Sequence, residues 1–140
     1  MAEVSTAGLR EAIRQLEKAD LYTDENIKAM LDAGFEVMQR AVKSAFVQSG
    51  HNRTGKTFSH ITRSPTVRHD KYGVPFAQVT LSGKDSRGQR YGTKAFVLNY
   101  GRRKGGRIAA DYYWSTAVKN AWKTANDAMS DVAARKLKGE

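Results

Sequence analysis

The chain of 140 residues has no cysteine, which excludes disulfide bonds, catalysis by a thiolate and cysteine-ligated zinc. It has only two prolines, and no apolar run approaches the roughly 20 residues that a membrane-spanning helix needs. The first fifteen residues include acidic side chains and lack the apolar stretch of a secretory signal. A chain of this length supports one hydrophobic core. We therefore expect residues 1–140 to form a single globular domain, made in the cytoplasm and not in contact with a membrane.

Acidic residues are scarce in the middle of the chain. Residues 51–110 contain thirteen Lys and Arg side chains but only two acidic ones, Asp70 and Asp85, for a net charge of +11. Residues 1–50 carry −2 and residues 111–140 carry +1, so the middle accounts for the whole excess of +10. This distribution predicts an electropositive surface for nucleic acid or for an acidic protein face. The alternative is a set of solvated loop residues that keep the protein soluble.

Two glycine-punctuated loops carry much of this charge, one over residues 83–92 and one over residues 102–107. We expect both loops to be mobile in the monomer and to become ordered on a partner. The candidate interaction residues are Lys84, Arg87, Arg90, Lys94, Arg102, Arg103, Lys104 and Arg107.

The sequence also lacks the arrangements of histidine and carboxylate side chains that perform catalysis or bind metals. His51, His60 and His69 are spaced nine residues apart, without the i, i+4 pairing on a helix or the nearby carboxylates that metal sites use. Asp70 and Asp85 are the only acidic residues of the middle region, so a carboxylate pair for acid–base chemistry would have to come from the helices. We expect no catalytic residue, no metal ligand and no cofactor, and hence no enzyme.

One nucleotide-binding pattern is nevertheless present, because residues 50–57, GHNRTGKT, match the phosphate-loop template G-x-x-x-x-G-K-[ST]. A working phosphate loop follows a buried strand and opens a helix, whose N-terminus then faces the phosphates. Here an amphipathic helix precedes the match, and Pro65 follows soon after it. We therefore expect Lys56 not to bind a nucleoside triphosphate.

Periodic apolar residues predict helices at both ends of the chain. An N-terminal helical arm is expected within residues 1–20, from about Thr6 to Ala19, and a long helix over residues 24–48, capped by Thr23 or Asp24 and followed by Gly50. A third helix is expected over residues 111–137, with Asp111 as its cap. The apolar stripe of the long helix is Ile27, Leu31, Gly34, Phe35, Met38, Val42 and Phe46. The stripe of the last helix is Trp114, Val118, Ala121, Trp122, Ala125, Met129, Val132 and Ala133, in which the two tryptophans are expected to fill the larger gaps.

Between these helices, residues 66–100 are predicted to form the sheet region. Thr66–Tyr72 and Phe76–Ser82 are rich in strand-forming residues and are separated by Gly73, which favours an antiparallel hairpin. The apolar run Ala95–Leu98 is compatible with a strand or with a short helix. The expected fold class is α+β, with a small, hairpin-based antiparallel sheet packed against two long amphipathic helices, one N-terminal and one C-terminal.

The order of these motifs resembles the tail-completion, or head-to-tail connector, proteins of tailed bacteriophages. The resemblance covers about Ile27 to Val132 and lies in three stretches: Thr54-Gly55 before Phe58, Ile61 and Ser64; the run Ala95–Gly101; and the helix entry Asp111–Ala117. Asn99 stands where that family commonly has glutamate, and Tyr112–Trp114 replace a phenylalanine-leucine-proline type of entry.

The resemblance implies a minor structural protein of the virion neck, made in the bacterial host cytoplasm, that forms a homo-oligomeric ring between portal and tail without catalysis. Its implied partners are further copies of itself and other neck, connector and tail-tube proteins, with non-specific contact to DNA. Two helices cover only one face of a small sheet, so we expect a strand edge or a sheet face to remain for a neighbouring copy.

A basic nucleic-acid-binding domain is the alternative function. It is suggested by the aromatic residues Tyr72, Tyr91, Phe96 and Tyr100 within the basic middle region, because exposed aromatic rings stack on bases while cations neutralise phosphates.

Overall fold

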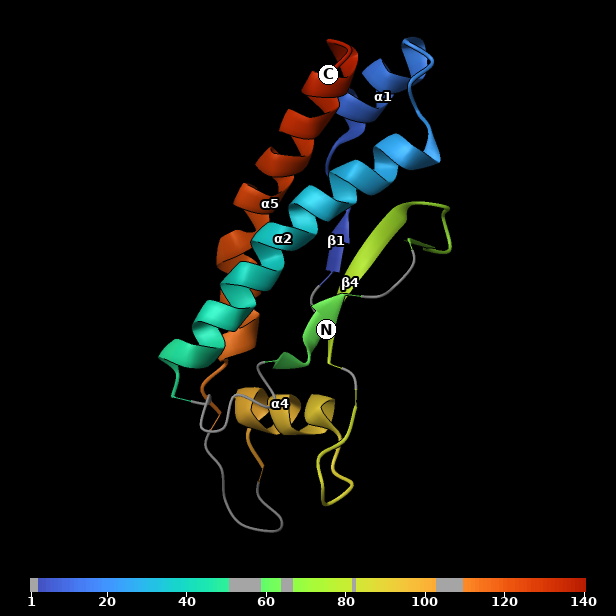
Figure 1. The fold of residues 1–140 in the computed structure, drawn as a ribbon. Helices are drawn as coiled ribbons and strands as arrows, with labels where there is room; N and C mark the ends of the chain where they lie inside the picture. Colours follow the sequence, from blue (N-terminus) through green and yellow to red (C-terminus); the bar gives the residue numbers. More distant parts are fainter. Residues whose placement is uncertain (1–2, 51–58, 64–66, 82, 103–109) are drawn as a thin grey trace.

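The computed structural model describes residues 3–50, 59–63, 67–81, 83–102 and 110–140, arranged as Figure 1 shows. They form an α+β fold with a small antiparallel sheet against long helices, which confirms the predicted fold class. Within these ranges, none of the helices combines the length and the apolar composition that spanning a bilayer requires. The elements in chain order are β1 (Glu3–Ser5), α1 (Arg10–Lys18), α2 (Asp24–Gln48), β2 (Ile61–Arg63), β3 (Arg68–His69), β4 (Pro75–Leu81), α4 (Tyr91–Tyr100) and α5 (Tyr113–Leu137).

Helix α2 begins and ends where its sequence predicts. The Oγ1 atom of Thr23 accepts a hydrogen bond of 3.2 Å from the backbone N–H of Asn26, which satisfies one of the unpaired donors at the start of the helix. Gly50, two residues beyond the end, has a φ of +76° that a residue with a Cβ atom rarely adopts. All seven residues of the predicted apolar stripe are buried.

Helices α2 and α5 run side by side in opposite directions and form the body of the molecule (Figure 1). Each has 25 residues and is therefore about 37 Å long at 1.5 Å per residue. The buried face of α5 includes Ala121, Ala125 and Ala133, whose small side chains let the α2 backbone approach closely. Met129 is fully buried between them. The two helices therefore supply most of the core.

Trp122 departs from the prediction that it fills a gap in the core. Its side chain is 45% exposed. It directly follows the buried Ala121, and one residue turns a helix by about 100°, so Trp122 lies beside the buried stripe and faces partly to solvent. Trp114 behaves as predicted and is buried.

Strand β4 is the centre of the sheet. It pairs antiparallel with β1, β2 and β3, with Val4 opposite Ala77, Ile61 opposite Leu81, and Arg68 opposite Phe76. The β3–β4 pairing confirms the predicted hairpin, although β3 has only two residues. Because β1 and β3 both pair with β4 at Phe76, β4 is not an open edge there. Helix α2 contacts β1, β2 and β4 and covers the sheet.

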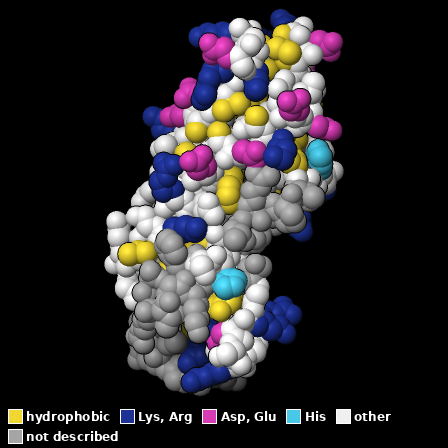
Figure 2. All heavy atoms as spheres, in the orientation of Figure 1, with side chains coloured by type: hydrophobic (Ala, Val, Ile, Leu, Met, Phe, Trp, Pro, Cys, Tyr) yellow, Lys and Arg dark blue, Asp and Glu magenta, His cyan; other side chains and the backbone are white. Residues whose placement is uncertain are grey.

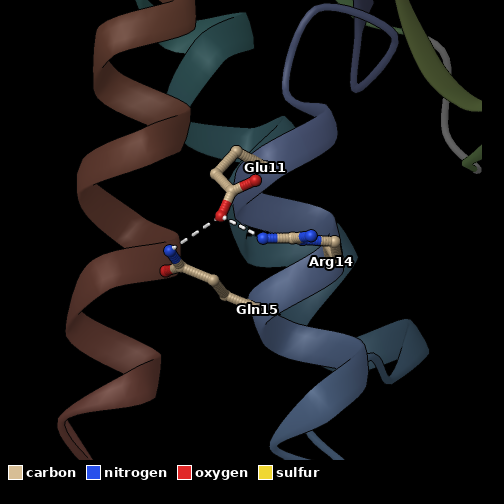
Figure 3. A network of polar contacts seen from close by, with 3 residues as sticks. All are labelled: Glu11, Arg14 and Gln15. Atoms are coloured by element: carbon tan, nitrogen blue, oxygen red, sulfur yellow. Dashed lines mark hydrogen bonds and ion pairs between the residues drawn. The ribbon is translucent and has the colours of Figure 1, made fainter.

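The N-terminal arm is only partly helical, contrary to the predicted helix from Thr6 to Ala19. Residues Glu3–Ser5 form β1, and α1 begins only at Arg10. Val4 is buried opposite Ala77 in the sheet, and three residues are too few to show a strand period in the sequence. On the exposed side of α1, beside α5, Oε1 of Glu11 accepts hydrogen bonds from Arg14 and Gln15 (Figure 3). These bonds lower the pKa of Glu11.

The sheet region does not extend to residue 100 as predicted, because residues Tyr91–Tyr100 form helix α4. Its buried residues Tyr91, Ala95 and Asn99 recur every four positions, which places them on one face of a helix. The run Ala95–Leu98 is therefore the short helix of the two alternatives. Helix α4 lies beneath the C-terminal end of α2, at the opposite end of the molecule from α1 (Figure 1).

Gly34 lies where α2 packs closely against both β1 and α5. A Cβ atom added at this glycine would lie 2.6 Å from Cγ1 of Val4 and 2.8 Å from Sδ of Met129. We predict that Gly34→Val lowers the free energy of unfolding by about 1–3 kcal/mol, because the site has no room for a branched side chain. Urea denaturation followed by circular dichroism measures the change.

Ser44→Val is the matched control, since Ser44 is exposed on the same helix. It should change the free energy of unfolding by less than about 0.5 kcal/mol. Equal stability of the Gly34→Val variant and the unmodified protein would contradict the packing described at Gly34.

Candidate interaction surface

The side chain of Asn99 joins the end of α4 to the beginning of α5. Its Oδ1 atom accepts hydrogen bonds from the backbone N–H groups of Trp114 (2.9 Å) and Ser115 (3.2 Å), and its Nδ2 atom donates to Oγ of Ser115 (2.9 Å). The first N–H groups of a helix have no partner within the helix, and Tyr112, which precedes α5, provides no side-chain cap. Asn99, only 2% exposed, therefore caps α5 from a different helix.

Three further hydrogen bonds strengthen this junction. The carbonyl oxygen of Asn99 accepts from the N–H of Tyr112 (3.0 Å), and the hydroxyl of Tyr113 donates to the carbonyl oxygen of Ala95 (3.3 Å). Oδ1 of Asp111 accepts from the N–H of Tyr113 (3.1 Å), so the predicted cap contributes one bond. Burial, and to a smaller extent the charge of Asp111, raise the pKa of Tyr113. Its hydroxyl therefore remains protonated and able to donate.

The junction holds Tyr112 in an unusual backbone conformation and turns its ring outward. Tyr112 has a φ of +54°, a left-handed conformation that costs a residue with a side chain roughly 1–2 kcal/mol. Its side chain is 53% exposed, and those of Phe96 and Tyr100 on α4 are 61% and 52% exposed. The Tyr100 ring centroid lies 4.7 Å from that of Phe96 and 6.2 Å from that of Tyr112. We call these three side chains the aromatic surface.

A pocket of about 470 Å³ opens beside the aromatic surface. Its apolar lining comes from β4, α4 and the start of α5, and the buried Nε1 atom of Trp114 has no hydrogen-bond acceptor in the described part of the chain. Pockets of 300–1,000 Å³ are typical of specific binding sites. The pocket is lined by Leu81, Gly92, Thr93, Ala95, Phe96, Asn99, Tyr100 and Trp114.

Some of the predicted interaction residues adjoin this pocket. Lys84 and Arg90 are exposed, pair through their backbones, and line a second pocket that shares Leu81, Gly92 and Thr93 with the first. Arg87 is exposed at the turn between them, and Arg102 is exposed just after α4. Lys94 instead forms an ion pair with Asp85 and lies 5.4 Å from the centre of the Tyr91 ring. Arg103, Lys104 and Arg107 lie outside the described residues.

Figure 2 shows the corresponding charge distribution on one face. Acidic side chains gather over the upper, helical end, mixed with basic ones. At the lower end, which holds α4, most of the charged side chains in view are Lys or Arg. The aromatic surface and its pocket therefore lie in the basic part of the molecule.

The two acidic residues of the middle region both close turns. Oδ1 of Asp85 accepts from the N–H groups of Arg87 and Gln89, each at 2.9 Å. Oδ1 of Asp70 accepts in the same way from Tyr72 and Val74. Each aspartate is followed three positions later by a glycine with a φ of +80°. The segment 83–90 is thus a turn held by hydrogen bonds to Asp85, where the sequence predicted a mobile loop, and its D-x-x-G pattern is the signal that indicates the turn.

The predictions for the histidines and aromatic residues of the middle region are confirmed for some of them and wrong for others. His60 stacks on the buried ring of Tyr91 with 4.1 Å between ring centroids, so Tyr91 is not the exposed stacking platform that the nucleic-acid hypothesis assumed. Tyr72 is exposed in the β3–β4 turn. In the described residues, no group of three His, Asp or Glu side chains is placed to hold a metal ion.

The GHNRTGKT match is described only at its first residue. Helix α2 ends at Gln48, two residues before Gly50, so a helix precedes the match as the sequence predicted, where a working phosphate loop has a strand. His51 and Lys56 lie outside the described residues, as do Thr54, Gly55 and Phe58.

Comparison with known proteins does not assign the chain to a family. No protein-family model matches it, and no curated protein or solved structure matches it. The described surface offers aromatic, apolar and cationic contacts around one pocket. Such a surface suits binding to a macromolecule.

We predict that Asn99→Leu lowers the free energy of unfolding by about 2–4 kcal/mol, because it leaves the N–H groups of Trp114 and Ser115 without an acceptor. Asn99→Asp retains an acceptor and places a negative charge at a helix N-terminus, so this variant should lose much less stability. Chemical denaturation compares the two. Equal stability of the two variants would show that the cap is not important.

The turn around Asp85 is predicted to open only at strongly acidic pH. The hydrogen bond with Lys94, followed by that with the N–H of Gln89, lowers the pKa of Asp85 from 3.8 to about 2. Because the folded-state pKa is lowered, the stabilisation is complete above the ordinary pKa and is lost as the pH falls from about 4 to about 2. The amide signals of Arg87 and Gln89 in NMR spectra report this titration.

Lys94→Met is the control for that titration, because it removes the largest contribution to the lowered pKa and should move the midpoint upward toward 3.8. A midpoint that is unchanged by this substitution would exclude Lys94 as the cause.

Proposed function

We propose that this protein is a structural protein of the neck of a tailed bacteriophage, which completes the tail and joins it to the portal or connector as a homo-oligomeric ring without catalysis. The observation that carries the proposal is the aromatic surface of Phe96, Tyr100 and Tyr112, held at one end of a rigid helix pair. Two of the stretches that resemble connector proteins, Ala95–Gly101 and Asp111–Ala117, meet at the Asn99 junction directly behind this surface.

Exposed aromatic rings in contact with one another favour a role in assembly. Clustered apolar side chains on a surface are costly in water and mark binding sites, and aromatic residues are enriched in protein interfaces. Tyr112 is turned outward by a left-handed backbone conformation, and such strain typically persists where it serves a function. The proposed partners are further copies of the chain and other neck, connector or tail-tube proteins, and the proposed location is the virion.

Nucleic-acid binding is the second candidate function, favoured by the exposure of Phe96 and Tyr100 beside Lys84 and Arg90. Aromatic stacking and phosphate neutralisation are the two contributions that single-strand binding uses. The two functions are separable by experiment, because binding to DNA weakens steeply as salt concentration rises.

The proposal predicts that the purified protein forms rings and that the protein is present in purified virions. Native mass spectrometry across concentration and electron microscopy of the particles test both points. The double variant Phe96→Ser/Tyr100→Ser should remain folded but assemble poorly, because it removes two of the three rings of the aromatic surface. Trp122→Ser is the matched control, since Trp122 is also an exposed aromatic residue but lies on α5 and not on α4.

Absence of the protein from purified virions would contradict the proposed function. Salt-sensitive binding of DNA that depends on Phe96 and Tyr100, together with normal assembly of the double variant, would favour the nucleic-acid function instead.

A further inference from the structure

The turn between α1 and α2 presents an exposed tyrosine on a hydrogen-bonded backbone. The N–H of Leu21 donates to the carbonyl oxygen of Leu16 (2.8 Å), and Nδ2 of Asn26 donates to the carbonyl oxygen of Leu21 (2.8 Å). Asp20 has a φ of +59°, which reverses the chain after α1. Tyr22 follows and is 40% exposed. The side chain is therefore displayed by a hydrogen-bonded turn.

Carboxylates flank this tyrosine in the sequence. Asp20, Asp24 and Glu25 are all exposed, within three positions of Tyr22. None of the three forms an ion pair with another described residue. The turn is thus an aromatic side chain flanked by negative charges that remain available to a partner.

The pocket beside the aromatic surface has an apolar interior, and the pocket that adjoins it carries the opposite charge to the turn. Its interior includes Leu81, Ala95 and Trp114, and Lys84 and Arg90 line the adjoining pocket. An aromatic ring entering the first pocket would bury apolar surface, while neighbouring carboxylates would face the cations. Among the described residues the Nε1 atom of Trp114 has no acceptor, and a tyrosine hydroxyl is able to act as one.

The turn and the pocket lie at opposite ends of the molecule, because the turn precedes α2 and α4 lies beneath the far end of that helix (Figure 1). Helix α2 is about 37 Å long, so the turn of one chain does not reach the pocket of the same chain. A contact between these two surfaces therefore requires two copies.

We propose that the α1–α2 turn of one copy docks into the pocket beside the aromatic surface of the next copy, with Tyr22 entering the pocket and its flanking carboxylates facing Lys84 and Arg90. Each copy uses one surface to donate and the other to receive, so the contact is head-to-tail and closes into a ring when the rotation between copies permits. This inference rests on the proposed function and identifies the surfaces through which the ring would form.

Charge reversal tests the electrostatic part of this contact. Asp24→Lys/Glu25→Lys and Lys84→Glu/Arg90→Glu should each weaken self-association by about tenfold or more in sedimentation velocity experiments, because each juxtaposes like charges. Mixing the two variants should restore association between unlike chains. Asp127→Lys, on the exposed surface of α5, is the control for a change of charge alone and should associate normally.

Cross-linking tests the geometry directly, because the chain has no cysteine of its own. Ala19 lies at the turn and Thr93 lines the pocket, and both are exposed. A short bis-maleimide reagent should link the Ala19→Cys variant to the Thr93→Cys variant in a mixture. It should not link Ala19→Cys to Thr124→Cys, whose position on α5 is also exposed.

Several results would overturn this contact. A protein that remains monomeric and gives no Ala19–Thr93 cross-link would exclude it. Rings that survive both charge reversals, without that cross-link, would refute the contact but leave the neck function standing. If Lys84→Glu/Arg90→Glu abolished binding to oligothymidine without changing association, the pocket would instead hold single-stranded nucleic acid. Absence from virions is the separate result that contradicts the proposed function.

Discussion

The cap that Asn99 places on α5 is the interaction on which the candidate surface depends. Helix α4 lies beyond the end of the α2–α5 pair, and the hydrogen bonds that join it to the start of α5 include those of Asn99, Tyr112 and Tyr113. A helix N-terminus buried without acceptors is strongly unfavourable. The same side chain therefore stabilises the start of α5, fixes the direction of α4 and brings three aromatic rings together.

The body of the molecule supplies the rigidity that this junction needs. Gly34 and the alanines of α5 allow two long helices to pack closely, and α2 covers a sheet that is organised around β4. The result is an elongated molecule with the exposed Tyr22 in a turn at one end and, at the other end, an apolar pocket beside the exposed Lys84 and Arg90. A subunit with two different, complementary ends suits head-to-tail assembly, and this is the physical basis of the proposed function and of the proposed contact.

Features with a strong local signal were predictable from the sequence. The cap at Thr23, the positive φ of Gly50 and the buried stripe of α2 follow from capping rules and helical periodicity, which act over a few residues. Features that depend on distant partners were not predictable. The burial of Val4 requires β4, and the role of Asn99 requires the start of α5, fifteen residues further along. The available signal for this role was that Asn99 is a polar residue between the apolar run Ala95–Leu98 and Tyr100. This signal did not indicate that Asn99 would cap the start of α5. The D-x-x-G patterns at Asp70 and Asp85 were local signals of turns, and an interpretation based on composition alone did not detect them.

Hydrogen exchange at the start of α5 tests the central claim most directly. Amide protons in the first turn of a helix are normally among the fastest to exchange, because their N–H groups lack partners within the helix. Trp114 and Ser115 lie in the first turn of α5. If Asn99 caps α5 as described, NMR should show these two amides exchanging about as slowly as those in the middle of α5. Rapid exchange of Trp114 and Ser115, with the rest of α5 protected, would contradict the junction and the surface built on it.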